Sequence, residues 1–249
     1  MSSAPGVDGE LPFLAHLIEL RERLLKAVVA IGVLFLAGIP FANRIYALLA
    51  QPLLAKMPAG TKMIAIEVAS PFLTPLKLNF FAALIVAMPY LLYQAWSFVA
   101  PGLYKHEKRL AVPLLVSAVA LFYTGCAFAY FLVLPAVFGF LQAVAPTGVA
   151  VMTDISQYLD FVLVLFLAFG LCFEVPVAVV ILVLLGWVTP AQLRESRPYV
   201  VVGAFVIAAV LTPPDVVSQL MLAIPMCFLY EIGILAARWL PAREDRAEP

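Results

Sequence analysis

The stretch YLDFVLVLFLAFGLCFEVPVAVVILVLLGWV, from Tyr158 to Val188, decides the class of fold. It is almost entirely apolar, and its charged side chains are Asp160 near its start and Glu174 near its middle. About 20 apolar residues in a row are enough for a helix to cross the hydrocarbon core of a bilayer. This stretch therefore predicts a transmembrane helix, and the same pattern recurs on both sides of it.

Outward from this stretch, similar apolar runs make the whole chain too apolar for a soluble domain. The 249 residues are 65% hydrophobic and 12% charged, with a mean hydropathy of +1.06, whereas a soluble domain is nearer half apolar and a quarter charged. We expect an all-α, polytopic integral membrane protein with one domain over residues 1–249. Its six predicted spans cover about 24–41, 76–100, 110–141, 158–188, 199–211 and 216–239, after an amphipathic helix at about 11–26.

For the last two runs, 199–211 and 216–239, the sequence predicts short fifth and sixth helices. The thirteen residues of the fifth run make roughly 20 Å of helix at 1.5 Å per residue, less than the roughly 30 Å of a hydrocarbon core. Two adjacent prolines in Thr212–Asp215 separate the runs. Because proline lacks an amide donor and disfavours helical geometry before it, this segment predicts a tight turn.

Lysines and arginines gather on one side of the predicted spans. Most of the lysines and arginines lie in the N-terminal segment, in the loops after the second and fourth spans, and in the tail. Since basic residues are enriched on the cytoplasmic side of membrane proteins, the topology is N-in and C-in. No secretory signal peptide or transit segment is visible, which favours the bacterial cytoplasmic (inner) membrane.

The sequence does not favour an enzyme, a cofactor or a metal site. It has no phosphate-binding loop, zinc-protease motif or nucleophile elbow. His16 and His106 are single residues, and Cys126, Cys172 and Cys227 lie inside apolar runs, where they are typical packing residues. The zero formal net charge gives no reason to expect nucleic acid as a partner.

The amphipathic segment LPFLAHLIELRERLLK, Leu11 to Lys26, leads into the first span. Glu19 and Arg23 stand four residues apart in the order that stabilises a helix, as do Glu22 and Lys26. One interpretation is an interfacial anchor whose charges are only solvated.

The loop after the second span contains SFVAPGLYKHEKR, Ser97 to Arg109. Glu107 is its single acidic residue, among basic and titratable neighbours. It either pairs internally with Lys105 or Arg109, or accepts an incoming cationic peptide.

Three further acidic residues lie within the predicted spans or at their ends. An acidic residue such as Glu174 costs about 2.5–3.5 kcal/mol at mid-bilayer on insertion scales, so it has a functional role or a structural interhelical hydrogen bond. Pro176 predicts a local kink beside it. Asp215 is placed to cap the last helix, and Glu231 to pair with Arg238.

Six separated motifs, in the same order, resemble the TatC family, the multispanning receptor subunit of the twin-arginine protein translocase. They are HLIELRERL (16–24), ASPFLTPLKLNFF (69–81), FVAPGLYKHEKR (98–109), FEVPVAV (173–179), RPYVVVGAF (197–205) and LTPPDVVSQ (211–219). The resemblance implies a six-helix, glove-shaped fold that binds twin-arginine signal peptides of folded cargo.

The resemblance also implies roles for individual residues. Glu19 and Glu107 correspond to the glutamates that recognise the paired arginines. Around them the signal-peptide surface includes Arg21, Phe98, Pro101, Leu103, Tyr104 and Arg109. Other functionally sensitive family positions correspond to the intramembrane residues Glu174 and Gln219 and, toward the periplasmic side, to Pro52 and Asp215.

The implied partners are single-span TatA- and TatB-type subunits packing beside the fourth to sixth helices, in a homo- and hetero-oligomer driven by the proton motive force. The alternative is a proton-coupled secondary transporter of a small solute, with Glu174 titrating. An inverted repeat would favour that alternative, and none is visible in the sequence.

Overall fold

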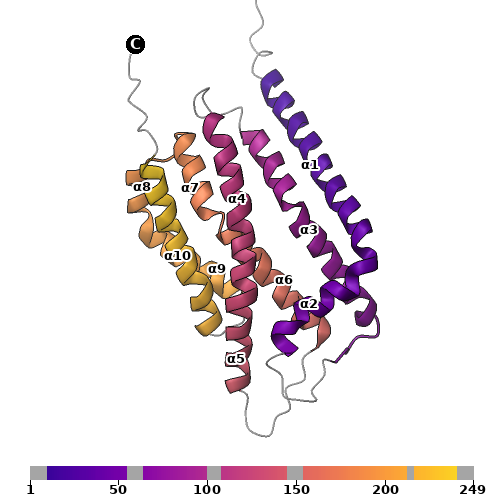
Figure 1. The fold of residues 1–249 in the computed structure, drawn as a ribbon. Helices are drawn as coiled ribbons and strands as arrows, with labels where there is room; N and C mark the ends of the chain where they lie inside the picture. The colour runs from indigo at the N-terminus through magenta and orange to yellow at the C-terminus, as the bar shows by residue number, and fades with distance from the viewer. Residues whose placement is uncertain (1–9, 55–63, 100–107, 145–153, 212–215, 240–249) are drawn as a thin grey trace, which may run out of the picture.

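The computed structural model describes residues 10–54, 64–99, 108–144, 154–211 and 216–239, and they are helical almost throughout (Figure 1). A 3-10 turn, Ile39–Phe41, joins the first two helices, and a π-helical turn, Ala129–Val133, joins the fourth to the fifth. The α-helices are α1 (Glu10–Gly38), α2 (Ala42–Leu54), α3 (Ser70–Val99), α4 (Lys108–Phe128), α5 (Leu134–Val144), α6 (Ile155–Cys172), α7 (Val175–Leu184), α8 (Pro190–Glu195), α9 (Arg197–Leu211) and α10 (Val216–Arg238).

Among the described residues, five long apolar stretches and one shorter apolar helix correspond to the six spans that the sequence predicts. Five stretches are long and apolar enough to span a membrane: Leu17–Leu49, Ser70–Phe98, Ala111–Val144, Ile155–Leu184 and Val216–Arg238. The shorter apolar helix α9 is the sixth element. The start of α1 and the end of α10 lie at the same end of the bundle (Figure 1), which agrees with termini on one side. We call this the inner end and the opposite one the outer end.

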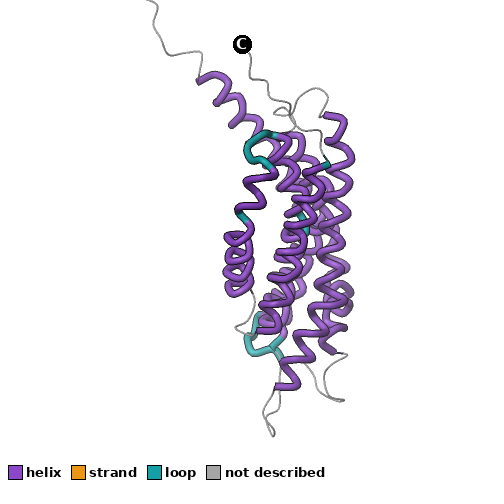
Figure 2. The backbone as a smooth tube through the Cα atoms, turned by 90° about the vertical axis from the view of Figure 1, so that its left-hand side faces the viewer, coloured by secondary structure: helices purple, strands orange, loops and turns teal. Residues whose placement is uncertain are grey.

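Of the two helices predicted to be short, only α9 is short. It has 15 residues, and in Figure 2 it ends partway along the bundle, at the left of the view. The sixth helix corrects the prediction, because α10 has 23 residues, roughly 35 Å at 1.5 Å per residue. The predicted span 216–239 already covered this length, and the helix continues through Pro225 without a break. The turn predicted at Thr212–Asp215 lies outside the described residues.

A hydrogen bond and close packing hold the corner between α1 and α2 against α3. The Asn79 side chain is buried and donates a hydrogen bond to the carbonyl oxygen of Phe35 (2.8 Å). Gly38 lies directly against the Asn79 amide, so a Cβ at position 38 would overlap it. Glycine at this position therefore lets the corner of α1 approach α3 closely.

The main core lies among α5, α6 and α10. Phe169, Leu165, Val137 and Leu222 are completely buried there. By contrast, none of the described apolar side chains of the first span is fully buried, and many are exposed, as is typical of a helix that faces lipid. The helix α1 packs along α3 at one flank of the bundle (Figure 1), so the residues at its inner end are positioned chiefly by α3.

Candidate functional site

At the inner end, α1 and α3 bring together Glu19, Arg23 and Gln94. One helical turn separates Glu19 from Arg23, and Arg23 donates from Nε (3.0 Å) and Nη2 (2.5 Å) to the same carboxylate oxygen, Glu19 Oε1. Its remaining nitrogen, Nη1, donates to Oε1 of Gln94 on α3 (3.3 Å). The arginine thus joins a carboxylate of its own helix to an amide of the neighbouring helix.

These three side chains differ in their exposure. Gln94 is buried, whereas the side chains of Arg23 and Glu19 are 22% and 36% exposed. Arg21, Glu22 and Lys26 on the same helix are exposed. The Glu19 carboxylate is therefore reachable from solvent, and it already binds a guanidinium group.

The other residues predicted for this surface are only partly described. Phe98 is half-buried near the end of α3. Arg109 lies in the first turn of α4, but its side chain lies outside the description. The remaining members, Pro101, Leu103, Tyr104 and Glu107, also lie outside the described residues.

Glu174 lies in a break between two helices. The helix α6 ends at Cys172 and α7 begins at Val175, with Pro176 in its first turn, so the predicted kink is present. The Oε1 atom of Glu174 is buried and has no hydrogen-bond partner among the residues that the structure describes. Close packing surrounds the break, since a Cβ on Gly233 of α10 would lie 3.0 Å from the Cα of Pro176.

Two polar residues of α10 contact α9. Gln219 donates from Nε2 to the carbonyl oxygen of Phe205 (3.3 Å). Glu231 binds Arg197 at the start of α9, with 2.6 Å between Oε2 and Nη2. The expected pair with Arg238 is therefore wrong, because α9 presents a cation directly opposite Glu231.

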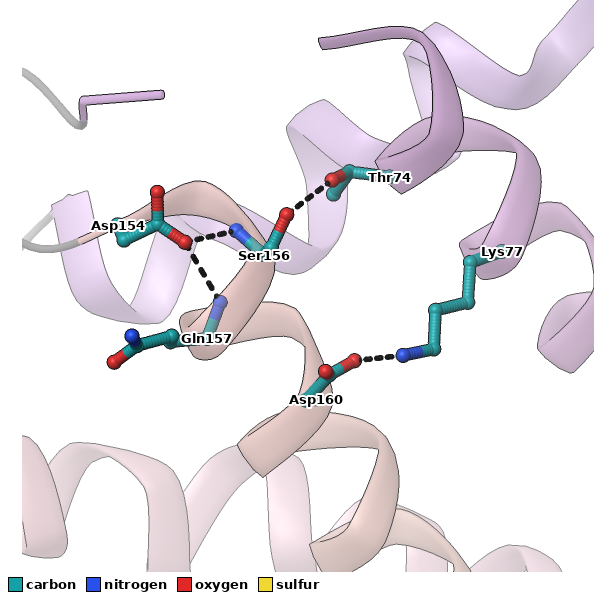
Figure 3. A network of polar contacts seen from close by, with 6 residues as sticks. All are labelled: Thr74, Lys77, Asp154, Ser156, Gln157 and Asp160. Atoms are coloured by element: carbon teal, nitrogen blue, oxygen red, sulfur yellow. Dashed lines mark hydrogen bonds and ion pairs between the residues drawn. The ribbon is translucent and has the colours of Figure 1, made fainter. Parts of the chain in front are cut away.

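At the outer end, Asp154 caps α6 (Figure 3). It also binds a second segment, at Ile66. Its Oδ1 accepts hydrogen bonds from the backbone N–H groups of Ser156 (2.9 Å) and Gln157 (3.0 Å). Its Oδ2 accepts one from the N–H of Ile66 (3.0 Å), and the N–H of Ile155 donates to the carbonyl of Ile64 (2.9 Å). These donors, led by those of Gln157 and Ile66, hold the pKa of Asp154 below its ordinary value.

Two further contacts extend this outer network from α6 to α3. The hydroxyls of Thr74 and Ser156 are 3.0 Å apart and share a hydrogen bond. One turn further along, Lys77 binds Asp160 (Figure 3). A cavity of about 650 Å³ lies beside the network and is also lined by Phe35 and Phe80.

Pro52, predicted as a functionally sensitive position, lies in α2. Because proline has no amide hydrogen, the carbonyl of Leu48, four residues earlier, loses its helical donor. The hydroxyl of Tyr130 donates to this carbonyl (2.9 Å), and the hydroxyl of Tyr158 donates to the next one, Leu49 (2.9 Å). Asp215, the other predicted position of this group, lies outside the described residues.

Sequence reasoning missed two important contacts. For Asp154, the signal was present, because Asp followed by Ser and Gln at the start of an apolar run is typical of a helix N-cap. For Gln94 there was no such signal, since its partner Arg23 is 71 residues away and is identified only by the packing of α3 on α1.

Comparison with known proteins agrees with this architecture. The family model described as "Sec-independent protein translocase protein (TatC)" matches residues 15–225. The TatC protein of Escherichia coli K12 is 57% identical over 94% of this chain and 90% of its own length. That of Azotobacter chroococcum is 56% identical over 99% and 97%.

A solved structure shows the same fold. The crystal structure of the twin-arginine translocase receptor TatC superposes with a TM-score of 0.79 at 38% identity, and it covers 90% of this chain and 98% of that one. This likeness overturns the alternative of a solute carrier. It also makes the protein a receptor and not a catalytic enzyme.

Three findings point to the same family. The architecture is all-helical and multi-pass, the family model matches most of the chain, and close relatives match nearly its full length. The chain therefore belongs to the TatC family, as the twin-arginine translocase receptor subunit for Sec-independent protein export in the bacterial inner membrane.

Proposed function

We propose that Glu19 and Glu107 bind the two adjacent arginines of the signal peptide. The observation that carries this proposal is the contact between the Glu19 carboxylate and a guanidinium group, that of Arg23, at 2.5 and 3.0 Å. A carboxylate and a guanidinium match in shape and hydrogen-bonding pattern, whereas a lysine ammonium is a point charge without this fork. Two such carboxylates discriminate arginine pairs from lysine pairs without any covalent chemistry.

The remaining residues of the surface contact the peptide around its arginines. In this proposal Phe98, Leu103 and Tyr104 pack against apolar side chains near the paired arginines. Pro101 shapes the loop, and Arg21 and Arg109 orient the two acidic residues through their charge.

Binding of a synthetic twin-arginine signal peptide to the full-length protein in lipid nanodiscs tests this proposal. We expect Glu19→Gln and Glu107→Gln each to weaken binding about tenfold or more, because each removes a charge-assisted hydrogen bond worth about 1.5–3 kcal/mol. Glu22→Gln is the matched control, since Glu22 is an exposed glutamate of the same helix. Undiminished binding by the Glu19 and Glu107 variants would refute the assignment.

We also propose that the break at Glu174 is a contact for a single-span TatA- or TatB-type subunit. The buried Oε1 of Glu174 supports it, because a buried polar atom without a partner costs about 1–3 kcal/mol. A polar side chain of a docking helix supplies the missing hydrogen bond. Gln219, which joins α10 to α9, is part of the same contact surface in this proposal.

Photocrosslinking distinguishes this contact from general exposure to lipid. A photoreactive residue at position 174 is expected to capture a single-span subunit. The same residue at Leu171, an exposed apolar position one turn earlier, is the control and is expected to capture it far less. Equal yields at the two positions would remove Glu174 from the proposed contact.

Pro52 and Asp215 complete the assignment as positions that shape the outer side of the receptor. Pro52 does so by leaving the Leu48 carbonyl to Tyr130. The proton motive force supplies the energy for transport in this proposal, since the sequence carries no nucleotide-binding loop.

A further inference from the structure

We propose that Arg23 is an internal competitor for the recognition carboxylate of Glu19, and that Gln94 holds Arg23 when a signal-peptide arginine displaces it. This inference rests on the proposed role of Glu19 in binding the signal peptide. It adds two residues, Arg23 and Gln94, to which the sequence assigned no such role.

Arg23 presents to Glu19 the same chemical group as the ligand, a guanidinium. Its Nε and Nη2 atoms donate to Glu19 Oε1 at 3.0 and 2.5 Å. Both donors converge on one carboxylate oxygen, whereas the strongest guanidinium–carboxylate pairs use two parallel hydrogen bonds to two oxygens. An incoming arginine that approaches with the parallel geometry therefore makes the stronger pair.

The pair between Arg23 and Glu19 is weak. Pairs four residues apart on a helix surface stabilise it only weakly, and both side chains are partly exposed. Exchange of one guanidinium for another is therefore inexpensive, and the pair lowers peptide affinity by only a small factor.

Gln94 is a partner for Arg23 after the signal-peptide arginine displaces it from Glu19. Its Nη1 atom donates to Gln94 Oε1 (3.3 Å), and Gln94 is buried in α3. This contact uses a different nitrogen from those that bind Glu19, so Arg23 keeps a partner after it releases the carboxylate. At 3.3 Å this contact is long while Arg23 binds Glu19, and release of the carboxylate lets the guanidinium shorten it, so Gln94 favours the open, peptide-ready state of Glu19.

A quantitative consequence separates competition from direct recognition. When the binding-competent state is only partly populated, every ligand that needs this state loses affinity by the same factor. Removal of Arg23 therefore tightens twin-arginine and twin-lysine peptides equally, and the ratio of their dissociation constants stays unchanged. If Arg23 instead shaped the carboxylate for arginine, its removal would change this ratio.

The experiment measures the dissociation constants of a twin-arginine peptide and its twin-lysine analogue for the full-length protein in nanodiscs. We expect Arg23→Gln to tighten both peptides about two- to fivefold, as follows from the small stability of such pairs. Lys26→Gln removes an equal charge from an exposed position three residues further along α1. Its effect, which measures general charge repulsion, is expected to be smaller and to vanish at high salt.

Gln94→Leu is expected to have the opposite effect. Without the amide, displaced Arg23 has no partner on α3, so both peptides bind more weakly. In an Arg23→Gln background the same Gln94→Leu change is expected to have no effect, because there is no guanidinium left to hold. Elution of each variant at the wild-type position in size-exclusion chromatography checks that the fold is intact.

The outcomes keep the two proposals apart. If Glu19→Gln leaves twin-arginine binding undiminished, the proposed function of Glu19 fails and the competition falls with it. If Glu19→Gln weakens binding but Arg23→Gln weakens it too, or leaves it unchanged, Glu19 keeps its role and the competition is refuted. An Arg23→Lys variant with affinity between the wild type and Arg23→Gln supports the competition, since lysine retains the charge but lacks the fork.

Discussion

Glu19 at the inner end accepts hydrogen bonds from an arginine side chain of its own helix, whereas Asp154 at the outer end accepts them from three backbone amides in two segments. The backbone donors of Asp154 are fixed by the fold. The donor of Glu19 is a flexible side chain at a partly exposed position. In our proposal, the same functional group therefore links two segments at one end and serves as an exchangeable binding site at the other.

The position of each carboxylate explains this difference. Asp154 precedes α6, where free N–H groups and the helix dipole favour an anion, and it is buried. Glu19 lies within α1, whose own backbone amides are already used in the helix. A carboxylate within a helix binds only side chains or ligands, and the partner that Glu19 binds here is the side chain of Arg23.

The largest expected effect on stability comes from removing the Asp154 side chain, which caps α6 and binds Ile66 at the outer end. Asp154→Ala removes the cap of α6 and leaves the N–H of Ile66 without its acceptor, so we expect a larger loss of stability than for any other change considered below. Reversible unfolding in detergent micelles measures it. Asp160→Ala is the matched control, because the Lys77–Asp160 pair is half exposed at both ends, and such pairs contribute about 0–1 kcal/mol. Equal losses for the two variants would contradict the special role of Asp154.

A smaller effect is expected where the outer end of α2 meets Tyr130. Tyr130→Phe removes the hydrogen bond to the Leu48 carbonyl and should lower the free energy of unfolding by about 0.5–1 kcal/mol. In a Pro52→Ala background, residue 52 regains an amide hydrogen for that carbonyl, so the same change should cost close to nothing.

Tyr158→Phe is the control for this coupling. Its acceptor is the carbonyl of Leu49, whose helical donor belongs to Leu53 and not to Pro52. A double-mutant cycle should therefore give coupling between Pro52 and Tyr130 but none between Pro52 and Tyr158. Absence of any coupling for Tyr130 would mean that proline does not govern this contact.

A still smaller effect on the free energy of unfolding is expected when the pH is lowered. Backbone N–H groups lower the folded-state pKa of Asp154, so its contribution is complete above the unfolded value of about 3.9 and is lost as the pH falls through the lower folded value. Wild type should therefore lose stability below about pH 4 more steeply than Asp154→Asn, which caps the helix without titrating. Parallel pH profiles for the two proteins would show that Asp154 does not contribute. The loss is partial because a protonated carboxyl still accepts hydrogen bonds.

The smallest expected effect on stability comes from a change at the inner end, Arg23→Gln. Arg23→Gln breaks the pair with Glu19, and its own side-chain amide can replace the guanidinium as donor to Gln94. It should therefore change the free energy of unfolding by no more than about 0.5 kcal/mol. Its consequence is expected in peptide binding instead. A large loss of stability for this variant would make the inner contact a structural joint like that of Asp154, and the contrast between the two ends would disappear.

Much of the candidate site could be predicted because it follows from short-range pattern. Glu19 and Arg23 are one turn apart on one helix, and Pro176 next to Glu174 predicts a break in the fourth span. The pairing of Glu231 was predicted wrongly for the same reason: its partner in sequence, Arg238, is nearer along the chain, but Arg197 on α9 is nearer in space. Local spacing does not report which helices become neighbours.

The sequence by itself determined that this chain crosses a membrane several times, because apolar length acts along one dimension. The placement of basic residues and the short motifs predict which end is cytoplasmic and which segments carry recognition chemistry. Only the tertiary structure decided that Gln94 binds Arg23 across 71 residues and that Asp154 binds Ile66 across 88. Such contacts depend on the register of packed helices, which close packing of side chains sets and no local pattern encodes.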